Sequence, residues 1–282
     1  MIPEFTQAIF LRSLDEWGAY PGKFNALSHA EQTEFLKGQG YASLHDLLAH
    51  VGVWWEEADS IIRDALENRE RPRRKYDFDE FNAASLKRFK DTPEAELLKW
   101  YESQRQKMIG LVTSVDPEQM KIRRVHGWFD AVTLLHLKEH GVSAPRFLVL
   151  DMLQREWASY ADNFHAMKED EQKAFLAKQG FPRFRDLIAH IIGWWEEGIQ
   201  IIDATAKNPA YRAPEKDTDS SNADLVELFG TLDEADVWKK YELTRAALIE
   251  LVINVPDETY DHKEVQAYLR SDVIEHYFDH AL

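Results

Sequence analysis

The sequence contains no cysteine, and this absence removes several kinds of chemistry at once. Disulfide bridges, thiolate-bound metal ions, iron–sulfur clusters and cysteine nucleophiles are all excluded. A chain without thiols fits a reducing compartment, and its first residues lack the basic stretch that opens a signal peptide. We therefore expect a cytoplasmic protein.

Long apolar runs and an excess of positive charge are also missing. No apolar run reaches the roughly 18 residues of a membrane-spanning helix, so we expect no membrane partner. The chain has 34 basic and 50 acidic residues, for a net charge of −16. Such a surface repels phosphate backbones, so we expect no nucleic-acid partner. The basic segment Arg69–Lys75 predicts a solvated loop or, as the alternative, a small patch for anionic ligands.

What the sequence does contain is an internal repeat. When the chain is shifted by 140 residues, 14 of the 27 positions in 31–57 are identical to those in 171–197. The matching register extends without gaps to the closing histidines of each copy. A repeat of this length is a domain rather than one turn of a solenoid. We therefore predict two domains, residues 1–140 and 141–282, joined by a short linker at 141–145.

Each copy reads as helical. In the first copy, apolar residues recur every 3.6 positions from about 44 to 68, with Ser43 and Asp46 as a capping pair. Further helices are expected over about 5–20, ending at Pro21-Gly22, then as a short helix capped by Asn82, and over about 92–113 and 128–140. A loop is expected over 70–81. The pattern predicts an all-α fold of two tandem four-helix bundles.

Six histidines recur at equivalent positions in the two copies, one on the second main helix and a His-x-x-x-His pair on the last. They are His50, His136 and His140 in the first copy and His190, His276 and His280 in the second. An i,i+4 pair lies on one helical face, so both imidazoles can meet a third from a facing helix. Three nitrogen ligands with an open position are typical of a catalytic divalent site, and both Zn and Ni suit imidazole. The alternative is that these histidines are packing residues.

Glu57 and Glu197 lie on the same helical face as His50 and His190. A carboxylate there can act as the general base on a metal-bound water, so we predict Glu57 and Glu197 as catalytic residues. The alternative is a solvated helix face. The neighbouring tryptophan pairs predict either core packing or an apolar wall beside the metal.

The order of these motifs resembles a known family. The helix with Ala49-His50 and Trp54, and the closing helix with the Glu-His-x-x-x-His motif of Glu275 to His280, are similar to the DinB/YfiT-like superfamily of metal-binding four-helix bundles. The stretches 79–82, 93–98 and 101–105 look most like the ClbS/DfsB-like branch. The resemblance covers essentially the whole chain, once per copy. The first copy departs from it at Leu135-His136, and the second at Ser220-Ser221.

The resemblance implies a divalent ion held by three histidines and an activity on reactive small molecules. Members include thiol-dependent transferases and isomerases, and proteins that hydrolyse or neutralise toxic metabolites, including self-resistance proteins. Because members often pair as homodimers, the two copies are expected to form a pseudo-dimer within a monomeric chain. We therefore predict a metal-dependent hydrolase or thiol transferase of the detoxification type. The alternatives are a non-catalytic protein that sequesters a small molecule and an interaction scaffold.

Overall fold

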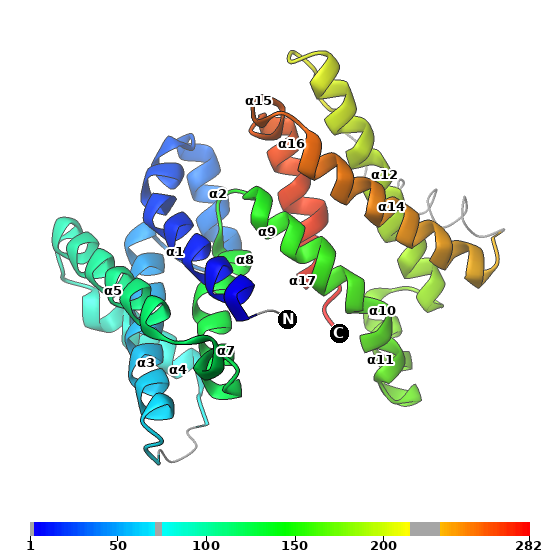
Figure 1. The fold of residues 1–282 in the computed structure, drawn as a ribbon. Helices are drawn as coiled ribbons and strands as arrows, with labels where there is room; N and C mark the ends of the chain where they lie inside the picture. Colours follow the sequence, from blue (N-terminus) through cyan, green and yellow to red (C-terminus); the bar gives the residue numbers. More distant parts are fainter. Residues whose placement is uncertain (1–2, 71–74, 215–231) are drawn as a thin grey trace. The chain divides into compact units, whose positions relative to one another are not determined.

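The structure is a computed structural model that describes residues 3–70, 75–214 and 232–282. Every regular element in these residues is helical, which confirms the expected all-α class. The chain divides into two compact units, Met1–Val142 and Ser143–Leu282, here called unit 1 and unit 2 (Figure 1). The sequence places the boundary after residue 140.

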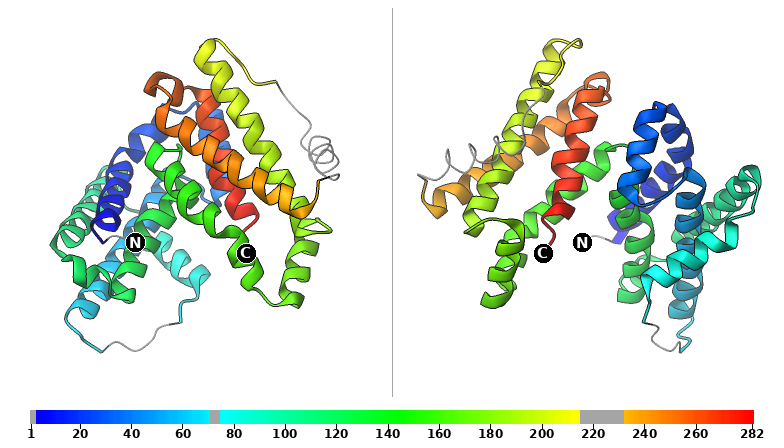
Figure 2. Two further views of the ribbon diagram at one scale, coloured as in Figure 1. Left: turned by 45° about the vertical axis from the view of Figure 1, so that its right-hand side comes forward. Right: turned by 180° about the vertical axis from the view of Figure 1, so that it is seen from behind.

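Unit 1 is built around three long helices and a composite last helix. Its elements are α1 Pro3–Ala26, α2 His29–Gln39, α3 Leu44–Leu66, α4 Phe78–Phe89, α5 Glu94–Ser114, α6 Pro117–Met120, α7 Arg123–Phe129, the π-helical η1 Asp130–Leu135 and α8 His136–His140. Helix α3 packs against α5 and α7, and α1 packs against α5 and η1 (Figure 2). Helix α4 lies against α3.

Unit 2 follows the same order of elements. They are α9 Arg146–Asp151, the π-helical η2 Met152–Glu156, α10 Trp157–Ala166, α11 Glu169–Gln179, α12 Phe184–Lys207, α14 Glu234–Asn254, α15 Asp257–Tyr260, α16 Lys263–Tyr268, the π-helical η3 Leu269–Glu275 and α17 His276–Asp279. Helix α12 packs against α14 and α16. The segment Ser220–Asn222 singled out in the sequence lies outside the described residues.

Helix α3 forms where the apolar period predicts it. Ser43 is its N-cap, and the Ser43 hydroxyl accepts a hydrogen bond from the backbone N–H of Asp46. This contact satisfies one of the N–H groups left unpaired at a helix start. The apolar face then buries Trp55 completely, together with its aliphatic neighbours. Helix α5 likewise confirms the helix expected over 92–113.

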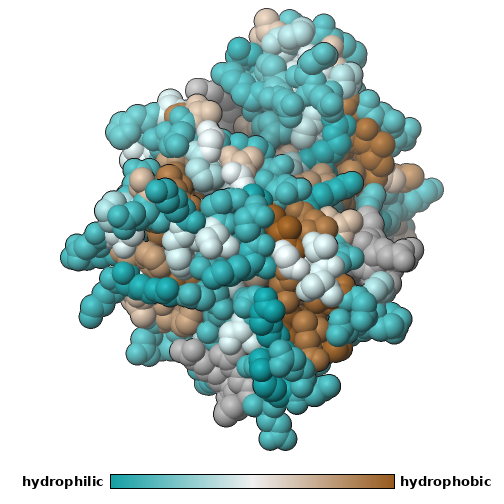
Figure 3. All heavy atoms as spheres, turned by 60° about the vertical axis from the view of Figure 1, so that its left-hand side comes forward, coloured by the Kyte–Doolittle hydropathy of each residue, from teal (hydrophilic) through white to brown (hydrophobic). Residues whose placement is uncertain are grey.

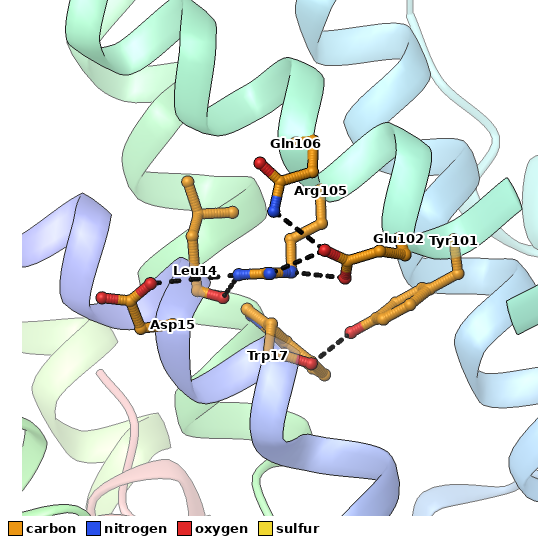
Figure 4. A network of polar contacts seen from close by, with 7 residues as sticks. All are labelled: Leu14, Asp15, Trp17, Tyr101, Glu102, Arg105 and Gln106. Atoms are coloured by element: carbon orange, nitrogen blue, oxygen red, sulfur yellow. Dashed lines mark hydrogen bonds and ion pairs between the residues drawn. The ribbon is translucent and has the colours of Figure 1, made fainter. Parts of the chain in front are cut away.

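Helix α1 does not end at Pro21-Gly22, so the expected break there is wrong. Proline has no N–H, and it therefore leaves the carbonyl of the residue four positions earlier, Trp17, without its helical partner. The hydroxyl of Tyr101 on α5 donates a hydrogen bond of 2.9 Å to that carbonyl (Figure 4). Because α5 supplies the missing donor, α1 continues to Ala26.

Arg105 ties the same two helices together. Its Nη1 donates a 2.9 Å hydrogen bond to the carbonyl of Leu14, and its guanidinium pairs with Glu102 (Figure 4). A Cβ on Gly18 would lie 2.7 Å from Cζ of Arg105. Glycine at this position therefore allows the guanidinium to reach the backbone of α1.

Three other expectations need correction. Asn82 does not cap a helix but lies inside α4, which Asp77 caps, so the expected loop ends earlier than residue 81. The last helix of unit 1 begins at Arg123 rather than near 128. Helix α2 was not expected, because it buries no residue and so has no apolar period, although Ser28 and Glu31 form a capping box at its start.

Hydrophilic side chains cover most of the molecular face drawn in Figure 3, and apolar residues gather there only in restricted patches. Among the described residues, no helix has the length and apolar character needed to cross a membrane.

Candidate metal centre

A π-helical stretch comes just before the paired histidines of unit 1. In η1 the regular hydrogen bonding of an α-helix is interrupted, and two buried indoles donate to its carbonyls. Nε1 of Trp55 bonds the carbonyl of Val132 at 2.8 Å, and Nε1 of Trp17 bonds that of Thr133 at 3.1 Å. These contacts hold the backbone one turn before His136 against both α3 and α1.

Unit 2 repeats this arrangement with equivalent residues. Nε1 of Trp195 bonds the carbonyl of Asp272 at 3.1 Å, and Nε1 of Trp157 bonds that of Val273 at 2.8 Å. Both tryptophans are completely buried, as their counterparts are in unit 1. The second tryptophan of each Trp-Trp pair is therefore a core residue that also fixes the backbone before the histidines.

The three repeated histidines of each unit come together. His50, His136 and His140 form one triad, and His190, His276 and His280 form the other. Within each triad, one nitrogen from every ring lies within 4.8 Å of the other two. Both triads can hold a metal ion. The sequence-derived grouping of all six histidines therefore agrees with the geometry.

A glutamine orients the last histidine of each triad. Nδ1 of His140 lies 2.5 Å from Oε1 of Gln39, and Nδ1 of His280 lies 2.8 Å from Oε1 of Gln179. Because an amide oxygen only accepts, Nδ1 carries the proton and Nε2 keeps its lone pair for the centre of the triad. Each glutamine ends its helix just before a glycine at φ +74° or +77°, a left-handed conformation that glycine adopts without strain.

Tyrosines fix the backbone of the same histidines. The hydroxyl of Tyr20 donates a 2.7 Å hydrogen bond to the carbonyl of His140, and that of Tyr160 donates one of 2.7 Å to the carbonyl of His280. In each unit, three backbone carbonyls and one histidine ring of the last helical segment are thus held by hydrogen bonds. Such support outside the ligand atoms is what keeps a metal site in shape.

Burial keeps four of the six triad histidines neutral. It lowers the pKa of His50 to about 2, with neighbouring His136 and His140 adding to the effect. It also lowers the pKa of His136 and of His280 to about 4, and that of His276 well below the usual value. Neutral imidazole is the form that binds metal, so these rings are ready to ligate at neutral pH.

In unit 2, one nitrogen–nitrogen distance matches the spacing around a tetrahedral ion, and a second is shorter. With metal–nitrogen bonds of about 2.05 Å, tetrahedral geometry places ligand nitrogens about 3.3 Å apart. In unit 2, Nε2 of His190 lies 3.3 Å from that of His280 and 2.8 Å from that of His276. In unit 1, both ring nitrogens of His50 are buried without a hydrogen bond in the described part of the chain. A bound ion would take one of these two nitrogens.

The triad of unit 1 lines a cavity of about 890 Å³. Its other walls include the aromatic side chains of Tyr41, Trp54, Tyr76, Phe78 and Trp128. Nε1 of Trp54 donates a 3.0 Å hydrogen bond to Asn82, which fixes this indole between the triad and α4. The first tryptophan of this Trp-Trp pair is therefore part of an apolar wall, which is one of the two interpretations that the sequence left open.

The triad of unit 2 lines a cavity of about 450 Å³ with a different character. Asp272 and Asp279 contribute to it, together with Phe181 and Trp194. Burial and the nearby Glu197 raise the pKa of Asp272 to about 7. Burial also raises the pKa of Asp279. The carboxyl group of Asp272 therefore stands where unit 1 has the apolar Val132, whereas Asp279 corresponds to Glu139.

The predicted catalytic carboxylates are adjacent to the sites. Oε1 of Glu57 accepts a 2.7 Å hydrogen bond from the hydroxyl of the cavity residue Tyr76. Glu197 lies near enough to Asp272 to raise its pKa. Asp46 and Asp186, on the same helix faces, lie at the helix starts, where Ser43 and Arg183 bond them.

The sequence did not point to two further pairs of site residues. Glu139 and Asp279, next to the last histidine in each unit, line the cavities, and Oε2 of Glu139 lies 3.9 Å from Nε2 of His140. Gln39 and Gln179 are the other pair. Both pairs recur in the shifted register, so a search for every recurring polar residue could have found them.

Comparisons with protein-family models, with curated proteins and with solved structures give no match to this chain. The geometry of the two triads and their cavities therefore carries the functional argument.

Proposed function

We propose that each unit binds a divalent metal ion through its histidine triad and that the chain is a metal-dependent enzyme acting on a reactive small molecule. The observation that carries the proposal is three converging imidazoles on the wall of a cavity, present in both units. Zn²⁺ and Ni²⁺ are the ions of choice, because imidazole suits both.

We infer further that the units are two tandem four-helix bundles of the DinB/YfiT-like kind, nearest to the ClbS/DfsB-like branch. The packing of α1, α3, α5 and the α7–η1–α8 segment supports this, as does the placement of the histidines on α3 and α8. Hydrolysis or thiol transfer in detoxification is the activity that this resemblance suggests. A pseudo-dimeric arrangement within a monomeric, cytoplasmic chain belongs to the same proposal.

Different residues of the site have different roles in the proposed reaction. A divalent ion bound by three imidazoles supplies a Lewis acid and activates a water or a thiol near neutral pH. The glutamine on Nδ1 keeps the ligating nitrogen of His140 or His280 turned toward the ion. Aromatic walls exclude water and hold the apolar part of the small molecule. Its electrophilic carbon would then form a bond to the oxygen of water in hydrolysis, or to the sulfur of a thiol in group transfer. The bond from this carbon to the leaving group would break, and the leaving group would depart with the proton that the nucleophile gave up.

A carboxylate must accept the proton of the attacking water. Glu139 lines the cavity beside a ligating nitrogen, and we propose that Glu139 and its counterpart Asp279 act as general bases. Glu57 and Glu197 are the second choice, because the Tyr76 hydroxyl donates a hydrogen bond to Glu57 and can relay a proton from the cavity to it.

Two probe reactions test the enzyme. Chain loaded with Zn²⁺ or Ni²⁺ should hydrolyse 4-nitrophenyl acetate, or couple a low-molecular-weight thiol to 1-chloro-2,4-dinitrobenzene, faster than chelator-treated chain. The double variant His50→Ala/His190→Ala should lose this gain, and His29→Ala, an exposed histidine on α2, should keep it. Equal rates in the double variant and the unaltered chain would overturn the proposal.

A second candidate function is non-catalytic sequestration of a small molecule, and the aromatic wall around Trp54 favours it. It predicts saturable quenching of tryptophan fluorescence by a ligand that is recovered unchanged. Ligand that is released as product would reject sequestration in favour of the enzyme.

A further inference from the structure

The cavity of unit 1 combines an aromatic wall with positive charge at its edge. Trp54 lies at the centre of the wall, with ring centroids 5.5 Å from Tyr76, 5.9 Å from Phe78 and 6.3 Å from Trp128. The same indole is 6.2 Å from the ring of His136. A flat apolar molecule lying against this wall would therefore reach the triad.

Arg123 and Arg124 line the same cavity and are exposed. Neither guanidinium has an ion-pair partner in the residues that the structure describes. Glu139 is the only carboxylate among the described lining residues. In a chain of net charge −16, an excess of arginine at a cavity edge stands out against its surroundings. Arginine presents several donors in a planar fork that suits carboxylates, sulfonates and phosphates.

The described residues of unit 2 lack this combination. Lys263 and Glu264 occupy the positions of Arg123 and Arg124, and they form an ion pair with each other at 3.9 Å. The described lining of the second cavity has Asp272 and Asp279 and no lysine or arginine. The arginine pair is therefore not a feature of the repeated scaffold but belongs to one cavity.

We propose that the cavity of unit 1 takes an aromatic small molecule carrying one anionic group, with the ring system against Trp54 and the anion at Arg123 and Arg124. A cavity of about 890 Å³ is of the size that holds such a ligand. That this ligand is the substrate, with its reactive carbon toward the triad, rests on the proposed metal-dependent function.

Two fluorescent probes distinguish the contribution of the anionic group to binding from that of the apolar rings. 8-Anilinonaphthalene-1-sulfonate carries the anion, and N-phenyl-1-naphthylamine has the same ring system without it. Titrations in excess chelator, followed by probe emission, should give tighter binding of the sulfonate. Raising NaCl from about 50 mM to about 500 mM should weaken binding of the sulfonate, because salt screens exposed charges. Binding of the neutral probe should not change.

The double variant Arg123→Ala/Arg124→Ala should weaken sulfonate binding by about three- to twentyfold, as expected for two exposed ion pairs. Binding of the neutral probe should not change. The matched control Lys99→Ala/Lys107→Ala removes the same charge from the exposed side of α5 and should leave both probes unaffected. Equal weakening in the two double variants, or no preference for the sulfonate, would overturn the inference.

This experiment is independent of the ion, because it is done on metal-free chain. Selective sulfonate binding without any turnover in the metal-loaded chain supports the ligand class and counts against the enzyme. Turnover without selective binding of the sulfonate supports the enzyme and overturns the ligand class.

Discussion

The two units share the support of their triads and differ in what surrounds them. In both, buried tryptophans bond the π-helical carbonyls, a glutamine holds the last histidine, and a tyrosine bonds its carbonyl. In the cavities, by contrast, Val132 of unit 1 corresponds to Asp272, and Ala131 to Ser271. The residues that support the triad and the residues that line the cavity therefore vary separately on one scaffold.

One pair of contacts shows how a small change reshapes a cavity wall. Tyr268 of unit 2 packs into α12, where a Cβ on Gly198 would lie 1.5 Å from its Cζ. Unit 1 has Ala58 and Trp128 at these positions, and Trp128 lines the cavity. Because unit 2 has glycine in place of alanine, the ring of Tyr268 packs against α12, whereas the equivalent Trp128 of unit 1 lines the cavity.

The largest expected effect concerns the general base. To observe unit 1 alone, the triad of unit 2 is removed by His190→Ala. In that background Glu139→Gln should lower turnover of the probe substrate by about 10²- to 10⁴-fold, as expected for removal of a general base. Glu57→Gln should lower it far less. The reverse order of the two effects, measured as kcat on metal-loaded chain, would move the role to Glu57.

The glutamines that bond Nδ1 of the last histidine should contribute equally to metal affinity in both units. Gln39→Leu and Gln179→Leu remove the acceptor from Nδ1, and each should weaken metal binding in its own unit by about 10- to 100-fold. Competition with a chromogenic chelator measures both sites. Gln106→Leu, on the exposed face of α5, is the matched control (Figure 4). Unchanged metal affinity after either glutamine substitution would show that this glutamine does not contribute to metal binding.

Helix contacts of unit 2 should be sensitive to a methyl group that unit 1 accepts. Gly198→Ala should lower the free energy of unfolding by about 1–3 kcal/mol, because Tyr268 must be displaced. Gly198→Ala/Tyr268→Ala should recover part of this loss by removing the clash. Ala58→Gly should cost the helix propensity of about 1 kcal/mol and the burial of one methyl group, about 0.8 kcal/mol. Urea unfolding measures all three, and a stabilised Gly198→Ala would contradict the close packing of Tyr268.

The smallest expected effect is a difference in acid sensitivity between the metal-free units. Buried histidines with lowered pKa bind fewer protons folded than unfolded, so their contribution is complete above about pH 6.5 and is lost as the pH falls toward 4. Asp272 acts in the opposite direction, because its raised pKa stabilises unit 2 as the pH falls below about 7. Unit 1 should therefore lose more stability than unit 2.

Hydrogen exchange of peptides from each unit, corrected for intrinsic rates, measures this difference. Asp272→Asn should make the loss in unit 2 steeper. If unit 2 without this substitution loses stability more steeply than unit 1 as the pH falls, the stabilising effect of the raised pKa of Asp272 is contradicted.

Much of this picture could be predicted from the sequence because it is local or repeated. The apolar period gave α3 and α5, and the shifted register gave the six histidines. The continuation of α1 through Pro21 could not be predicted, because the donor that replaces the missing N–H comes from Tyr101, far along the chain. The π-helical stretches likewise depend on indoles from other helices.

The roles of individual side chains were harder to predict than the grouping of the histidines. Glu57 and Glu139 are both acidic residues on helices that carry a histidine, and helical angle alone favoured Glu57. Only packing shows that Glu139 lines the cavity and that Tyr76 bonds Glu57. The charge of Arg123 and Arg124 was visible in the sequence, but their place at the cavity edge was not.

The central claim is that both triads bind metal, and elemental mass spectrometry of gently purified, untagged chain tests it most directly. We predict about two divalent ions per chain, about one in His136→Ala or His276→Ala, and none in the double variant, because each unit has three ligands from its own helices. A chain that contains no divalent ion, and that takes up neither Zn²⁺ nor Ni²⁺ when offered them, would contradict the account.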